Sequence, residues 1–259
     1  MGILNVTPDS FYSLSRSMSS REIDTNVATL IDEGADMIDI GGYSSRPGAE
    51  DVSPDEELRR IEAGIEAIRR HSTDIPISVD TFRADVAHTA VTRLGADIIN
   101  DISGGELDDK MIDVVALTHA PYIMMHMRGT PADMQQHVTY NDVTADVVGW
   151  LSRRLALFSL AGAGDIIIDP GFGFSKTVDQ NFELLARLEM FQSLERPILA
   201  GVSRKSMIYR TLDITPETSL NGTSVINTMA LERGASILRV HDVAPAREAV
   251  ELVMKTMQY

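Results

Sequence analysis

Three short apolar runs of this sequence each end in an acidic or amide side chain. Asp80 closes the run ISVD, Asn100 closes DIIN and Asp169 closes DIIID. A carboxylate accepts two parallel hydrogen bonds from the amino-amidine edge of a flat heterocycle such as guanine or pterin, and an Asn side chain complements the remaining donors and acceptors. The three residues therefore predict a pocket for such a ring, and Met125, Phe174 and the Arg239 guanidinium are candidates to cover its faces.

Basic side chains form a second group in a chain that is otherwise strongly acidic. They are Arg46 in YSSRPGA, Arg204 and Lys205 in GVSRKSM, and Arg239 with His241 in LRVHD. This set predicts a clamp for an anion, because barrels of the α/β class often bind phosphate with the loops after their last two strands and with a helix N-terminus. The alternative for any one of these residues is an ion pair with a surface acid.

The segment IIIDPGFGFSK, residues 166–176, indicates how one carboxylate is placed. Three isoleucines fit a strand that is buried on both faces, so Asp169 should lie at the carboxyl end of that strand. One proline and two glycines then end the strand and permit a sharp turn. We expect this turn to leave Phe172 and Phe174 free to wall a pocket.

Eight apolar runs, each followed by a helical stretch, are the elements that must hold these side chains. The runs are MGILNV, MIDIGG, IPISVD, DIINDIS, PYIMMHM, DIIIDPG, PILAGVS and ILRVHD. Helical periodicity is clearest over residues 21–34, 54–71, 144–162 and 219–233, and Ser53 is the expected cap of the second of these. Gly34, Gly95, Gly164 and Gly234 should end helices before the even strands, while Pro76, Pro121 and Pro197 open three odd ones.

This alternation predicts an α/β protein with a single (β/α)8 TIM barrel over residues 1–259, and an open doubly wound sheet of eight strands is the alternative. The site of such a barrel lies at the carboxyl ends of its strands. The polar residues there are Asn5, Ser45, Arg46, Asp80, Asn100, Asp101, His126, Asp169, Ser203 to Ser206, Arg239 and His241.

Composition limits the partners and the compartment. The formal net charge of -15 opposes binding to nucleic acid or to an anionic membrane. The absence of cysteine excludes disulfides, thiolate metal sites and a thiol nucleophile, and it fits a cytoplasmic location. The N-terminus has neither a basic segment nor an apolar run long enough for a signal peptide.

Motifs spread over the chain resemble those of the dihydropteroate synthase family, and in the family's order. They are MGILNVTPDSF, SSRPGAE, ISVDT, INDIS, MMHMRGTP, IDPGFGF, GVSRKSMI and LRVHDV. The resemblance implies a TIM barrel that condenses 6-hydroxymethyl-7,8-dihydropterin pyrophosphate with 4-aminobenzoate, giving dihydropteroate and pyrophosphate in folate synthesis. It also implies a Mg2+ cofactor and a cytoplasmic homodimer whose partners are these small molecules.

The resemblance assigns roles to individual residues by matching motif. Asp80, Asn100, Met125, Asp169, Lys205 and Arg239 match the pterin site. Asn5, Ser45, Arg46, Arg239 and His241 match the pyrophosphate site, with Asn5 at the metal. Pro47, Phe174, Lys205 and Ser206 match the 4-aminobenzoate pocket. Asp80, Lys205, Asp9 and Phe11 are the residues closest to catalysis.

Three features of the sequence depart from the family pattern. The chain reads YSLSR after PDSF, where a short Gly-rich turn is usual, and it carries Tyr43 where an acid is common and Ser175 where Gly is common. We expect residues 7–16 to be mobile in the free protein and to close over the reacting methylene when Mg2+ and pyrophosphate bind.

An arylamine is unprotonated near neutral pH, so the expected reaction needs no general base for attack and proceeds by dissociative substitution at the pterin methylene. Three alternatives use the same residues. They are methyl transfer from methyltetrahydrofolate to a corrinoid, a Schiff-base aldolase built on Lys205, and a pterin-binding relative without catalysis.

Overall fold

Eight short parallel strands form the centre of the molecule, and each pairs with its neighbours in chain order, β1 to β8. A computed structural model describes residues 1–7, 20–43 and 52–259. The strands are β1 (Gly2–Asn5), β2 (Ile38–Gly41), β3 (Ile77–Asp80), β4 (Ile98–Asp101), β5 (Tyr122–Met125), β6 (Ile166–Asp169), β7 (Ile198–Ala200) and β8 (Ala235–Leu238). A parallel bridge between Gly2 and Val240 closes the ring. The predicted TIM barrel is thus confirmed over the open sheet.

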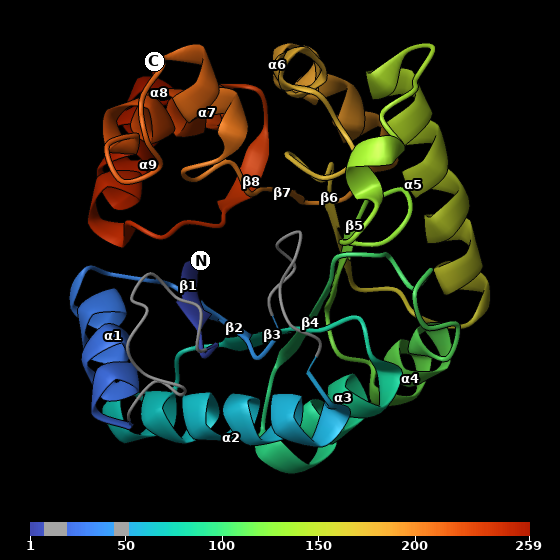
Figure 1. The fold of residues 1–259 in the computed structure, drawn as a ribbon, viewed down its shortest axis with the longest axis vertical. Helices are drawn as coiled ribbons and strands as arrows, with labels where there is room; N and C mark the ends of the chain where they lie inside the picture. The colour runs from blue at the N-terminus through green and yellow to red at the C-terminus, as the bar shows by residue number, and fades with distance from the viewer. Residues whose placement is uncertain (8–19, 44–51) are drawn as a thin grey trace.

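Helices lie outside the strands and cover the barrel (Figure 1). They are α1 (Ser20–Asp32), α2 (Pro54–His71), α3 (Ala84–Thr89) continuing into η1 (Ala90–Leu94), α4 (Met111–Thr118), η2 (Met134–Gln136), α5 (Val143–Leu160), α6 (Val178–Ala186), η3 (Leu188–Leu194), α7 (Ser206–Thr211), α8 (Leu220–Glu232) and α9 (Val243–Thr256). None of the helices in the described ranges combines the length and apolar character needed to span a bilayer.

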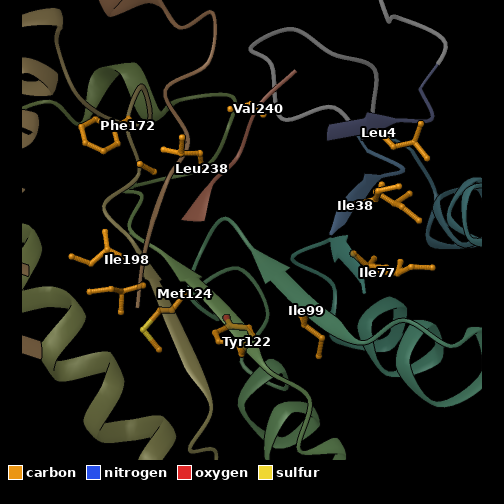
Figure 2. Packing of buried hydrophobic residues seen from close by; sticks show 14 of the residues in the cluster. Leu4, Ile38, Ile77, Ile99, Tyr122, Met124, Phe172, Ile198, Leu238 and Val240 are labelled. Atoms are coloured by element: carbon orange, nitrogen blue, oxygen red, sulfur yellow. The ribbon is translucent and has the colours of Figure 1, made fainter. Parts of the chain in front are cut away.

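Strand periodicity divides the core into two parts, because successive side chains point to opposite faces of the sheet. Figure 2 shows outward-facing residues of successive strands, such as Ile38, Ile77 and Ile99, which are fully buried in the main core cluster together with helix residues. The inward-facing residues form a second cluster that fills the barrel, here called the plug. The plug consists of Met1, Ile98, Ile123, Ile167 and Leu199, with Met37 and Ile237 packed against it.

The predicted joints between elements are confirmed with one exception. Gly34, Gly95 and Gly234 have φ values of +86°, +83° and +96°, the left-handed conformation that glycine adopts without strain after a helix. The prediction for Gly164 is wrong: α5 ends earlier, and Gly162 has the left-handed conformation there, with a φ of +92°.

The three predicted prolines each precede an odd strand directly. Pro76, Pro121 and Pro197 have no amide hydrogen, yet each accepts a hydrogen bond from the preceding strand through its carbonyl, at 2.9 to 3.0 Å. The cap of α2 is also as predicted, since the amide of Glu56 donates to the Ser53 hydroxyl at 3.2 Å. Local sequence therefore determines where these elements begin.

Candidate active site

The site lies next to the plug, on the side of the strands' carboxyl ends. Residues two positions apart on a strand point to the same side of the sheet, so a residue two positions after a plug residue also points into the barrel. The pairs are Ile98 with Asn100, Ile123 with Met125, Ile167 with Asp169, and Ile237 with Arg239. Strand register places Asp80 beside Asn100, and Met125 beside Asp169. Predicted site residues from five strands thus share one end of the barrel.

A network of charged and amide groups connects several of these residues. The Arg239 guanidinium donates from Nε to Asp39 Oδ2 at 2.6 Å and from Nη2 to Asp80 Oδ2 at 2.8 Å. Asp39 Oδ2 also accepts from the Asn100 amide at 3.1 Å, and Asp39 Oδ1 accepts from the Ser78 hydroxyl at 2.6 Å. Arg239 is therefore held between two carboxylates.

Three groups of the site titrate abnormally because they are buried. Burial raises the pKa of the Asp80 carboxyl to about 7, although the Arg239 charge opposes the shift. Burial likewise raises the pKa of Asp169, against the charge of Lys205. Burial lowers the pKa of the Lys205 ammonium to about 8, against the charge of Asp169. Near neutral pH the site can thus gain or lose a proton at low cost, as functional sites commonly can.

Asp169 is fixed by the turn that follows it. Its Oδ1 atom accepts a hydrogen bond from the Gly171 amide at 2.7 Å. Gly171 has a φ of +73°, and a Cβ there would lie 2.0 Å from the His126 carbonyl oxygen, so only glycine fits. The other carboxylate oxygen, Oδ2, lies on the side of Gly201, 3.9 Å from where a Cβ of that glycine would be.

A buried lysine, Lys176, supports the same turn from behind and was not among the predicted site residues. Lys176 Nζ donates to the carbonyls of Gly171 and Phe174 at 2.9 and 3.0 Å, and it lies 3.0 Å from His126 Nδ1. Burial lowers the pKa of both Lys176 and His126 well below their usual ranges. In the sequence, the one indication of this role was that Lys176 lies two positions after the end of the apolar turn GFGF.

The two phenylalanines of the turn have different environments. The expectation that both wall a pocket is wrong for Phe172, which is fully buried in the main core (Figure 2). Phe174 is half-buried, packs with the cluster that contains Met125, and has the Lys205 ammonium 4.6 Å from its ring centre. Lys205 Nζ also donates to the Phe172 carbonyl. Phe174 and Lys205 therefore line one surface together.

Arg204, one residue of the predicted anion clamp, does not face the site. Arg204 donates to both oxygens of Asp242, at 2.8 and 2.7 Å, and to the carbonyls of Pro216 and Glu217, so it ties two loops together instead of facing the site. His241 lies beside Ser203: its amide donates to the Ser203 hydroxyl at 3.2 Å, and that hydroxyl lies 3.0 Å from Nδ1. This contact directs Nε2 away from Ser203.

Two other strand-end residues belong to the scaffold. Asp101 accepts from the Tyr122 hydroxyl at 2.7 Å and from backbone amides of the following loop. His126 is fully buried and packs edge-on against Trp150, with ring centres 5.0 Å apart. Both follow an inward-facing residue and so point outward. The expectation that they line the mouth is wrong.

Ser206 begins α7 as predicted, directly after Lys205. Asn5 ends β1, and its amide oxygen lies where a Cβ on Gly41 would approach to 3.3 Å, so the glycine leaves room for that oxygen. An amide oxygen is a hard donor of the kind that Mg2+ accepts, and Mg2+ usually takes its other ligands from water and substrate phosphates. Asn5 fits that role, and the described residues contain no cluster of three or more acidic or histidine ligands.

Five predicted residues lie outside the described ranges. They are Asp9, Phe11, Ser45, Arg46 and Pro47. The proposed closing loop, residues 7–16, also lies outside them except for Thr7.

Sequence comparison gives a consistent result over almost the whole chain. The profile of the pterin binding enzyme family matches residues 1–241. The dihydropteroate synthase of Bacillus subtilis is 43% identical over 245 residues, covering 94% of this chain and 83% of that protein. The Escherichia coli K12 enzyme is 40% identical over 259 residues, covering 99% and 91%.

Solved structures agree with this result. The Xanthomonas albilineans dihydropteroate synthase with 4-aminobenzoic acid superimposes with a TM-score of 0.92 at 38% identity, covering 100% of this chain and 93% of that one. The same enzyme in complex with 7,8-dihydropteroate gives a TM-score of 0.88 at 36% identity, with the same coverage.

Proposed function

The chain belongs to the dihydropteroate synthases within the pterin-binding enzyme family, and from this premise we propose that it condenses 6-hydroxymethyl-7,8-dihydropterin pyrophosphate with 4-aminobenzoate. The products are 7,8-dihydropteroate and pyrophosphate. One observation carries the proposal within the structure: Asp80, Asn100 and Asp169 share the end of a barrel with Lys205 and Arg239, directly above an apolar plug.

Asp169 and Asn100 supply the hydrogen bonds that a pterin edge requires. The free Oδ2 atom of Asp169 accepts from the amino-amidine edge, and the Gly171 amide keeps the carboxylate in place at 2.7 Å. Asn100 meets the ring from the neighbouring side of the barrel. Met125 and the Arg239 guanidinium flank the ring faces, where a polarisable thioether and a planar cation both pack well.

The bond change explains why no catalytic base is needed. The carbon–oxygen bond between the pterin methylene and pyrophosphate breaks, and pyrophosphate leaves with the electron pair. The amine nitrogen of 4-aminobenzoate then forms the new carbon–nitrogen bond and loses one proton to solvent. Asp80, when ionised, stabilises the positive charge that develops on the pterin. Its pKa of about 7 means that this form is available at neutral pH.

The leaving group is received on the basic side of the site. His241 is oriented by the Ser203 hydroxyl, and Arg239 lies between Asp39 and Asp80. Asn5 would hold a Mg2+ ion, which supplies positive charge to the pyrophosphate when bound. Ser45 and Arg46 belong to this side by motif alone.

The 4-aminobenzoate pocket is proposed on the surface shared by Phe174 and Lys205. The Phe174 ring offers an apolar wall, the Lys205 stem lines the same space, and the first turn of α7 at Ser206 receives the carboxylate. Pro47 is assigned here by motif, while Asp9 and Phe11 are assigned to the catalytic side by motif.

A coupled assay of pyrophosphate release with both substrates and Mg2+ tests the proposal. Product formation that requires both substrates supports it. Methyl transfer to a corrinoid protein, or trapping of a Schiff base on Lys205 by borohydride, would favour the rival activities. Binding of pterin without any turnover would indicate a non-catalytic relative.

We further propose a homodimer located in the cytoplasm, as the family resemblance implies. Sedimentation equilibrium of the purified protein measures the first property, and cell fractionation measures the second. A monomer at micromolar concentration would contradict the dimer.

A further inference from the structure

Asp39 on β2 is a buried carboxylate that lies at the level of the plug. Register pairs Asp39 with Ser78, and Ser78 with the plug residue Ile98. Strands β4 to β8 place apolar side chains at this level, whereas β2 and β3 place two polar ones there, both fully buried. Burying a charge in an apolar plug is costly unless it is paired and hydrogen-bonded, so the contacts of Asp39 define its role.

Those contacts connect Asp39 to two residues of the pterin site. Asp39 Oδ1 accepts a hydrogen bond from Ser78 Oγ at 2.6 Å. Asp39 Oδ2 accepts from Arg239 Nε at 2.6 Å and from Asn100 Nδ2 at 3.1 Å. Three donors, one on β3, one on β4 and one directly after β8, thus fix one carboxylate. Because the Asn100 nitrogen is turned toward Asp39, the Asn100 amide oxygen faces the other way.

We propose that Asp39 is a positioning residue for the condensation: it holds Arg239 beside Asp80 and fixes the Asn100 amide so that its oxygen is presented to the pterin. This inference rests on the proposed function. Asp39 lies beneath Asn100 and Arg239, so it acts through them without touching the substrate.

The charge of Asp39 has a second effect, on Asp80. Among the neighbouring carboxylates, Asp39 contributes most to raising the pKa of Asp80. Neutralising Asp39 removes that contribution and leaves Asp80 as the carboxylate hydrogen-bonded to Arg239, so the pKa of Asp80 should fall. The charged groups that act on Asp80 are Arg239 after β8, Asp39 on β2, Glu57 on α2, Asp101 on β4 and Lys205 after β7.

The test is Asp39→Asn, which keeps the shape of the side chain. An Asn oxygen can still accept from Arg239 and Asn100, and its nitrogen can donate to the Ser78 hydroxyl, so mainly the charge is lost. Carbon-13 NMR of labelled aspartate carboxyls, with the Asp80 signal assigned by its loss in Asp80→Asn, should show a titration midpoint about 7 in the parent. We expect that midpoint to fall by roughly 1 pH unit in Asp39→Asn.

The same variant should lose activity. A looser Arg239 should lower kcat/KM for the pterin substrate on the order of 10-fold to 100-fold. Asp101→Asn is the matched control, because Asp101 is equally buried but bonds to Tyr122 and loop amides. It should lower stability, yet leave kcat/KM near the parental value and move the Asp80 midpoint less than Asp39→Asn does.

A second variant decides the matter if Asp39→Asn does not fold. Ser78→Ala removes the hydroxyl that holds Asp39 Oδ1 and leaves the charge in place. It should lower kcat/KM for the pterin substrate several-fold. The Asp80 titration midpoint should stay within about 0.3 pH units of the parent, because the charge of Asp39 is unchanged.

An unmoved Asp80 midpoint in folded Asp39→Asn overturns the inference, and so does parental kcat/KM in Ser78→Ala. These results are separate from the proposed function, because the midpoint is measured without substrate and turnover is measured on the parent enzyme. A parent that turns over while the midpoint stays fixed contradicts only the role of Asp39.

Discussion

Replacement of Asp169 by Asn is the most informative single change in the pterin site. In the parent, Oδ1 accepts from the Gly171 amide at 2.7 Å, which leaves Oδ2 to accept from the ring. In Asp169→Asn the oxygen should stay with Gly171, because an amide NH2 cannot accept there. The nitrogen then takes the place of Oδ2 and presents a donor to the donors of the pterin edge.

The size of the effect follows from this geometry. A hydrogen bond to a charged group contributes about 1.5 to 3 kcal/mol, and a buried donor left without an acceptor costs about 1 to 3 kcal/mol. Because the two contributions overlap, we expect a loss of about 2 to 4 kcal/mol, which is roughly 30-fold to 1000-fold in Kd.

Isothermal titration with a pterin ligand measures this loss. Asp165→Asn is the control, since Asp165 is exposed and immediately precedes the same strand. Pterin affinity within threefold of the parent in a folded Asp169→Asn would refute the assignment of Asp169 to the pterin edge.

Three further changes test other parts of the site. Lys205→Ala should raise KM for both substrates, because its ammonium faces the pterin side and its stem lines the 4-aminobenzoate pocket; normal steady-state kinetics for both would contradict this. Lys176→Met should lower the free energy of unfolding by about 2 to 4 kcal/mol in urea titrations, since it leaves the Gly171 and Phe174 carbonyls without their donor, and an unchanged midpoint would argue against that support. Hydrogen exchange over residues 7–16 should slow when Mg2+, pyrophosphate and a pterin bind, whereas equal exchange in both states would show that this loop is no lid.

The barrel could be predicted from local sequence because its signals are local. Each strand is a short apolar run, Pro76, Pro121 and Pro197 mark three strand starts, and Ser53 caps its helix where expected. The site could be predicted from the same pattern, since a polar residue that points inward at the carboxyl end of a strand must lie at the barrel mouth.

Several wrong predictions concern residues close to a site residue in the sequence, where only the direction of the side chain separates the site from the scaffold. Asp101 and His126 stand one position beyond inward-facing residues, so they point outward into the scaffold. Phe172 likewise turns into the core, while Phe174 stays at the site. Residue type at a strand end was therefore insufficient without the period-two alternation.

Other residues depended on contacts between distant parts of the chain. Arg204 matched an anion clamp by type, but Asp242 lies within reach in the fold and occupies it. Asp39 was overlooked because it lies inside MIDIGG instead of at its end, although its spacing from Gly41 already placed it on the inward face. Its partner Arg239 is 200 positions away in the sequence.

The most direct test of the account is a single-turnover experiment on the parent protein with Mg2+, the dihydropterin pyrophosphate and 4-aminobenzoate. Chromatography of the products should give dihydropteroate and pyrophosphate in equal amounts, and no dihydropteroate should form when 4-aminobenzoate is withheld. Tight pterin binding without dihydropteroate formation would contradict the account.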